Sequence, residues 1–214
     1  EVPGITYDKL QPKITDTARK LWELYLLLTI ICAILLYFSG MNIFDAVCHS
    51  LTTLASGGYS TKNASIAYWA SPTIHYIIIF FMIIAGTNFS LLYGAMIRRQ
   101  WKRLIYDEEF KTYIYSILGV SLIIAIGLIC TRAFDGFQSI EKAFRDALFQ
   151  IVATMTTTGF STSDYMSWHP ILWLVMLLVI PMGATAGSTS GGIKIIRLHI
   201  VAKNIFYEFK RVMH

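Results

Sequence analysis

The chain has 214 residues, 55% of them hydrophobic and 14% charged, and its mean hydropathy is +0.56. This composition argues against a soluble domain, which needs more polar side chains to keep a wet surface, and favours a membrane protein. The net charge of +5 would also suit a nucleic-acid-binding protein, so the position of the basic residues has to decide. The cysteines Cys32, Cys48 and Cys130 lie far apart and indicate neither a zinc site nor a disulfide framework.

Residues 1–20 are polar and lack the apolar core of a signal peptide, so we expect a cytoplasmic lead-in. The chain begins with Glu1 rather than methionine, and it ends at His214 while a helical pattern is still running. We therefore expect it to be a piece of a longer protein. Residues 21–38 carry one charge, Glu23, and as a helix would be about 27 Å long, which is enough to span a bilayer.

A short helix is predicted next, over residues 43–55. Asn42 can cap its first turn, with Asp45 three positions later in the manner of a capping box. At about thirteen residues this helix is too short to span a membrane. The sequence Ser-Gly-Gly-Tyr-Ser-Thr at residues 56–61, here called the first glycine turn, should end it, and residues 72–97 form a second spanning candidate.

The same order of elements returns after a basic cluster and a cytoplasmic linker at residues 104–112. The first unit therefore covers residues 21–103 and the second covers residues 113–214. The predicted elements of the second unit are an apolar helix over 113–130, a short helix over 139–153, the second glycine turn at 156–162, an apolar helix over 170–182, a glycine-rich loop at 183–194 and a helix over 195–209.

A shift of 101 positions aligns the two units without a gap. Tyr59 then faces Phe160, and six of seventeen positions between residues 45 and 61 are identical. These identities are Asp45 with Asp146, Ala46 with Ala147, Thr53 with Thr154, Gly58 with Gly159, Ser60 with Ser161 and Thr61 with Thr162. The chain is thus predicted to repeat one unit of helix, short re-entrant helix, glycine turn and helix.

The basic residues predict the orientation of the chain. The segments that precede each first helix and follow each second helix contain fourteen lysines and arginines, whereas the two glycine-turn sides contain four. Basic loops stay in the cytoplasm, so both glycine turns should enter the membrane from outside. This distribution accounts for the positive charge without a nucleic-acid partner, and no basic face with interleaved aromatic residues lies outside the membrane pattern.

The glycine turns are candidates for binding a dehydrated cation. A short helix that enters from outside points its negative end toward the membrane centre, and the chain that returns can offer carbonyl oxygens in place of water. Gly58 and Gly159 would let the backbone turn its carbonyls one way, and the hydroxyls of residues 156–158 could add ligands or brace the turn. Tyr59 and Phe160 are expected to pack behind the turns.

The glycine-rich loop interrupts what would otherwise be one very long apolar helix. Its small and hydroxyl residues are Gly183, Ala184, Thr185, Ala186, Gly187, Ser188, Thr189, Ser190, Gly191 and Gly192, followed by Ile193 and Lys194. Irregular backbone at this depth survives only against protein or a wet cavity, so it indicates the path of an ion or solute. A phosphate-binding loop fits poorly, because Lys194 comes one position late and no hydroxyl follows it.

These features together resemble the M1–P–M2 repeats of the Trk/Ktr/HKT superfamily of potassium transporters, and residues 186–194 resemble that family's intramembrane gating loop. The resemblance implies an all-α membrane protein with two M1–P-loop–M2 repeats, re-entrant pore helices and a broken final helix. It implies that the two units are the second and third of four repeats around one pore, with the first and fourth absent.

By the same resemblance, the selectivity filter would include Ser56, Gly57, Gly58, Thr156, Thr157, Thr158 and Gly159, with K⁺ bound at Ser56, Gly57, Thr157 and Thr158. Residues 183–193 would form the gate, and the only small-molecule component would be K⁺ as the bound and transported ion. The first glycine turn departs from the family pattern, since it reads Ser-Gly-Gly-Tyr where the second reads Thr-Thr-Gly-Phe.

The resemblance also implies the surroundings of the protein. It predicts a multi-pass protein of the plasma membrane, the inner membrane in a bacterium, in contact with lipid. The missing repeats of the parent chain would complete the pore, parent chains would form a homodimer, and a cytoplasmic nucleotide-binding subunit would regulate opening. No pair of residues in the sequence suggests an enzyme's nucleophile and base.

Other interpretations remain open from the residues alone. The chain could belong to a secondary transporter with a solute site at the broken helix, or to a structural membrane subunit. His75, Asn88 and His199 could line a pathway or be satisfied by neighbouring helices. The pair Asp45 and Asp146 could attract cations or stabilise their helices. The pair Lys194 and Arg197 could hold the loop through its carbonyls or anchor it at the membrane interface.

Overall fold

The computed structural model describes residues 14–131 and 137–213. The described part of the chain is all-α, as predicted, and its only β-type pairing is an isolated bridge between Met182 and Ile193. The α-helices are α1 (Ile14–Phe38), α2 (Ile43–Leu54), α3 (Pro72–Ala85), α4 (Phe89–Met96), α5 (Trp101–Tyr106), α6 (Glu108–Thr131), α7 (Phe137–Met155), α8 (Pro170–Val179) and α9 (Ile195–Val212), with short 3₁₀ turns at Ser65–Tyr68 and Tyr165–Ser167.

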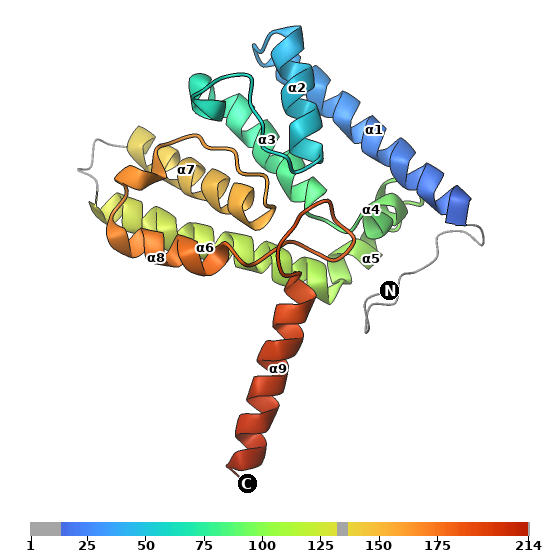
Figure 1. Ribbon diagram of the computed structural model, residues 1–214, viewed down its shortest axis with the longest axis vertical. Helices are drawn as coiled ribbons and strands as arrows, with labels where there is room; N and C mark the ends of the chain where they lie inside the picture. The colour runs from blue at the N-terminus through green and yellow to red at the C-terminus, as the bar shows by residue number, and fades with distance from the viewer. Residues whose placement is uncertain (1–13, 132–136, 214) are drawn as a thin grey trace.

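The first unit begins with a long helix, α1, paired with a short one, α2. Figure 1 shows α2 folded back beside the end of α1, after the turn at Ser39 and Gly40. Asn42 caps α2 as predicted, because its side-chain oxygen accepts a hydrogen bond from the Asp45 backbone N–H at 2.7 Å. The second unit repeats this arrangement with α6 and α7, although α7 extends beyond the predicted 139–153 at both ends.

The spanning candidate over residues 72–97 is not one continuous helix. The structure divides it into α3 and α4, which are bent by 108° at Gly86, Thr87 and Asn88. The Asn88 side chain accepts hydrogen bonds from the backbone N–H groups of Ser90 and Leu91, so it caps a new helix rather than lining a pathway. The break leaves backbone carbonyls that accept hydrogen bonds from the glycine-rich loop.

The predicted linker at residues 104–112 also has regular structure. Helix α5 occupies most of its first half, and α6 begins at Glu108, five residues before the predicted start of the apolar run. The side chain of Asp107 caps α6, since its carboxylate accepts a hydrogen bond from the Phe110 N–H at 2.8 Å. The polar residues of the predicted linker thus end α5 and start α6.

Among the described residues, the two helices Thr15–Phe38 and Glu108–Thr131 are long and apolar enough to cross a membrane, and the bent pair α3–α4 would make a third if it is one span. Only 28% of the most apolar window of each long helix is buried. Exposed side chains such as Ile30 on α1 and Ile126 on α6 therefore present apolar surface outward, as lipid contact requires. Figure 1 shows α9 extending alone from the rest of the fold.

Candidate functional site

The first glycine turn follows α2 in a tight, hydrogen-bonded form. Ser56 and Gly58 adopt positive φ angles of 53° and 67°. The carbonyl of Thr52 accepts the N–H groups of Gly57 at 2.8 Å and of Gly58 at 3.5 Å. These bonds satisfy the end of the helix and reverse the chain within a few residues.

The second glycine turn has the same geometry at the 101-residue offset. Thr157 and Gly159 have φ angles of 55° and 81°. The carbonyl of Ala153, the counterpart of Thr52, accepts the N–H groups of Thr158 at 2.9 Å and of Gly159 at 3.1 Å. The weak sequence repeat therefore corresponds to two backbone turns of the same form.

The two turns touch each other. A Cβ atom built on Gly58 would lie 1.7 Å from the carbonyl oxygen of Thr158, so only glycine fits there. Phe160 is fully buried with its ring centroid 5.9 Å from that of His49, and the Ala67 N–H donates to the Ser161 carbonyl at 3.1 Å. The structure thus brings the predicted residues of both turns to one place.

Tyr59 does not pack behind its turn as expected. Its side chain is 80% exposed, whereas its counterpart Phe160 is fully buried between the two units. The physical reason is that Phe160 has the other unit beside it, while no described residue covers the equivalent side of the first unit.

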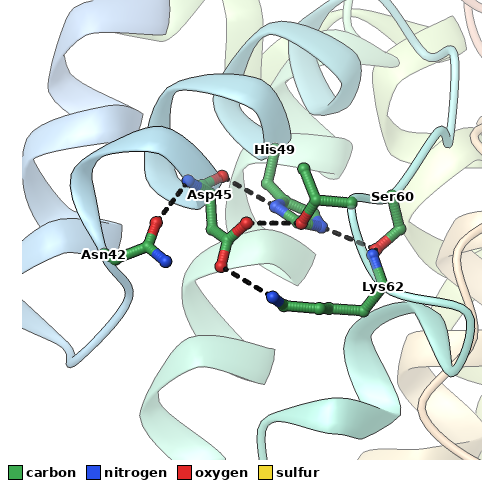
Figure 2. Close-up of polar contacts among 6 residues, drawn as sticks. Asn42, Asp45, His49, Ser60 and Lys62 are labelled. Atoms are coloured by element: carbon green, nitrogen blue, oxygen red, sulfur yellow. Dashed lines mark hydrogen bonds and ion pairs between the residues drawn. The ribbon is translucent and has the colours of Figure 1, made fainter.

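A cluster of polar side chains braces the segment that leaves the first turn (Figure 2). The Thr61 hydroxyl donates to the Asp45 carboxylate at 2.5 Å, and the Lys62 ammonium lies 3.6 Å from its other oxygen. His49 lies 2.7 Å from the Asp45 backbone carbonyl and 2.9 Å from the Ser60 hydroxyl. A carbonyl only accepts, so Nδ1 of His49 carries the proton and Nε2 accepts from Ser60.

The second unit keeps part of this brace, because the Thr162 hydroxyl donates to Asp146 at 3.4 Å. Both aspartates are buried, with 3% exposure for Asp45 and 2% for Asp146. The two aspartates therefore tie α2 and α7 to the segments that follow the glycine turns. This favours the stabilising interpretation over an attraction of cations at an outer mouth. Sequence reasoning missed His49 because glutamine replaces it in the second unit.

Replacing Asp45 with alanine should lower the unfolding temperature on the order of 5 °C, because the buried carboxylate that binds Thr61 and Lys62 would be lost. The Thr61 hydrogen bond, with Lys62 nearby, holds the pKa of Asp45 below its ordinary value despite burial. This stabilisation should be complete above the ordinary carboxyl pKa and be lost as pH falls through the lowered one. Thermal unfolding in detergent at several pH values measures both effects. Asp16→Ala is the control, because Asp16 is exposed. Equal unfolding temperatures of Asp45→Ala and Asp16→Ala would contradict the stabilising role of Asp45.

The glycine-rich loop closes on itself at the base. The Gly183 N–H donates to the Ile193 carbonyl at 2.8 Å, and the Ile193 N–H donates to the Pro181 carbonyl at 2.9 Å. Gly187 and Gly192 take positive φ angles of 76° and 70°. Residues 184–192 therefore form an excursion whose two ends lie side by side.

The first half of the loop, residues 183–186, is buried against the break between α3 and α4. Thr185 donates twice to the Gly86 carbonyl, from its N–H at 3.1 Å and from its hydroxyl at 2.9 Å. The Phe89 N–H at the start of α4 donates to the Gly187 carbonyl at 3.2 Å. The glycine-rich loop therefore packs against the bend between α3 and α4, which the sequence did not predict.

The second half of the loop reaches the glycine turns. The Gly191 N–H donates to the Thr157 hydroxyl at 2.7 Å, and the hydroxyls of Ser56 and Thr189 lie 2.9 Å apart. Ser56 and Thr157 are counterparts in the repeat, so the same position of each turn holds the loop. Thr189 and Gly191 are exposed, which places them on an open face next to both turns.

Lys194 holds the loop through a carbonyl, which was one of two interpretations of the sequence. Its ammonium donates to the Ser190 carbonyl and to the Ser190 hydroxyl, the latter at 3.1 Å. His75, another candidate, contacts the Trp69 carbonyl through Nε2 at 2.8 Å and is buried. His199 lies on α9, and its Nε2 has no hydrogen-bond partner among the described residues.

The comparison with known protein families agrees with this arrangement. The family model described as "TrkH: Cation transport protein" matches residues 5–214. The chain belongs to the TrkH family. The Trk system potassium uptake protein TrkH of Escherichia coli is 40% identical over 222 residues, and TrkG of the same organism is 34% identical over 219 residues.

The crystal structure of the potassium transporter TrkH from Vibrio parahaemolyticus has the same fold, with a TM-score of 0.90 and 35% sequence identity. The match covers 100% of this chain and 44% of the Vibrio parahaemolyticus chain. The chain likewise spans 44% of the length of the E. coli TrkH and TrkG proteins. Membership of this family, with two long apolar helices, indicates a multi-pass membrane protein.

Proposed function

We propose that this chain forms part of a potassium uptake pore, with the two glycine turns as part of the selectivity filter and the glycine-rich loop as its gate. The observation that carries the proposal is the contact of the loop with both turns, through Ser56 and Thr157. The relatives named above are potassium uptake proteins, which supports K⁺ as the ion.

In this proposal, K⁺ exchanges its hydration shell for backbone carbonyls of the two turns and for the oxygens around Ser56, Gly57, Thr157 and Thr158. The adjoining carbonyls of Gly58 and of Thr156 and Gly159 shape the same filter. The positive φ values at Ser56, Gly58, Thr157 and Gly159 support such a role, because they let successive peptide groups turn toward one side.

We also propose that parts of the protein outside this chain complete the filter. Two turns enclose only part of a fourfold site, and the chain spans 44% of its relatives. The exposed Tyr59 supports this, because its counterpart Phe160 is buried by the neighbouring unit. A homodimer, a regulatory nucleotide-binding subunit and a bacterial inner membrane remain proposals from the family resemblance alone.

Rubidium uptake by the full-length protein in liposomes tests the proposal. Gly159→Ala should reduce uptake about tenfold or more, because alanine in the left-handed region costs about 1–2 kcal/mol and would turn the filter carbonyls. Gly119→Ala is the matched control: Gly119 lies on α6, and a Cβ there would meet nothing within 4 Å. Uptake of an organic solute in place of rubidium would instead favour a secondary transporter.

A further inference from the structure

One carboxylate contacts the buried half of the glycine-rich loop. Glu109, in the first turn of α6, accepts a hydrogen bond from the Ala186 N–H at 2.6 Å. Ala186 itself is 3% exposed, so this N–H has little access to water. A short hydrogen bond to an ionised acceptor is about twice as strong as one between neutral groups.

The surroundings of Glu109 act on its carboxylate in both directions. Burial is the largest influence and opposes the negative charge, as Asp107 also does, whereas the N–H groups of Ala186 and Ile196 and the Lys194 ammonium support it. Lys194 in turn donates to the Ser190 carbonyl at the other end of the loop. Two residues of opposite charge therefore hold the loop: Glu109 binds the Ala186 N–H group, and Lys194 binds the Ser190 carbonyl.

The position of the Glu109 contact matters because the two halves of the loop differ in their exposure to solvent. Residues 183–186 are buried, whereas Gly187, Thr189, Gly191 and Gly192 are exposed. Gly187, with its positive φ, separates the two halves and can act as a pivot. Glu109 holds the residue directly before that pivot.

We propose that Glu109 is a positioning residue that fixes the base of the glycine-rich loop, so that the exposed half rests against the glycine turns. This inference depends on the proposed function for its effect on ion flux, but the contact itself can be tested without it. Without the Glu109 carboxylate, the buried half keeps the bonds of Thr185 to Gly86, of Phe89 to Gly187 and of Gly183 to Ile193 but loses its one charged partner, and the exposed half should leave the turns more often.

Hydrogen–deuterium exchange of the full-length protein tests the contact. In Glu109→Ala the amides of residues 183–190 should exchange about tenfold faster, because one charge-assisted hydrogen bond is lost. Glu109→Gln keeps an acceptor of the same length but no charge, so its exchange should fall between Glu109→Ala and the native protein. Glu108→Ala is the control, since Glu108 is exposed in the same helical turn. Unchanged exchange in both Glu109 variants would overturn the proposal.

Basal rubidium flux in liposomes tests the consequence. It should rise in the order native, Glu109→Gln, Glu109→Ala, with rubidium-over-sodium selectivity and thermal stability of the glutamine variant unchanged. A merely structural role would lower stability and flux together, and that result would also overturn the proposal. Absence of rubidium flux in the native protein would contradict the proposed function instead, while the exchange result would still decide the role of Glu109.

Discussion

Gly58→Ala is expected to abolish rubidium uptake by the full-length protein, the largest loss that we expect from a single substitution. The new Cβ would overlap the Thr158 carbonyl oxygen, at 1.7 Å, and Gly58 also has a φ of 67°. Because the backbone fixes the position of a Cβ and its partner is a backbone oxygen, no rotation of a side chain can relieve the overlap. The two glycine turns would have to separate, and with them the carbonyls that we assign to the filter.

Two other glycines provide graded comparisons for this result. Gly57 has no positive φ, and a Cβ there would lie 3.6 Å from the Tyr59 ring and 3.8 Å from the Thr52 carbonyl, so Gly57→Ala should cost less. Gly119→Ala should leave uptake unchanged. Uptake is measured with matched amounts of folded protein in liposomes. Near-native uptake by Gly58→Ala would show that the turns need not touch for conduction.

Removal of residues 184–192 is expected to raise basal rubidium flux by on the order of tenfold or more. The excised segment contains both contacts with the glycine turns, through Thr189 and Gly191. The cut ends already lie together, because the Gly183 N–H bonds to the Ile193 carbonyl at 2.8 Å. Joining them should therefore disturb α8 and α9 little while it removes the proposed barrier.

The deletion is measured as rubidium efflux from liposomes, alongside thermal unfolding to confirm that the protein is folded. Thr189→Ala provides a milder companion, since it removes the hydroxyl that faces Ser56 and leaves the backbone of the loop in place. A smaller rise is expected from it. If the deletion left a folded protein with flux unchanged or reduced, the glycine-rich loop could not be the gate.

Local patterns in the sequence were sufficient for most of the secondary structure. Apolar runs between polar turns predicted α2 and α8 closely, because helix formation and capping depend on neighbours a few residues apart. They also predicted the apolar parts of α1 and α6, although these helices begin at Ile14 and Glu108, before the predicted starts at residues 21 and 113. The 101-residue repeat predicted that the two glycine turns would be equivalent, and the structure shows matching φ angles and hydrogen bonds at Gly58 and Gly159. The family was also identifiable from these patterns, and the family comparison confirms it.

The local cues failed at the bend between α3 and α4. The apolar pattern of residues 72–97 resumes directly after Gly86, Thr87 and Asn88, and an isolated glycine or asparagine within an apolar helix is not by itself a break. The carbonyls of Ala85 and Gly86 leave the helical pattern, where Thr189 and Thr185 from the loop about a hundred residues later donate to them.

The sequence by itself therefore determined most of the helices, the repeated turns and the membrane class, because each depends on composition or on short-range periodicity. Only the tertiary structure decided that the loop rests on the α3–α4 bend, that Ser56 and Thr157 hold it, and that Glu109 binds its base. These are hydrogen bonds between residues 34 to 133 positions apart. Residue types at such separations do not reveal a contact, since direction and distance come from the packing of the whole fold.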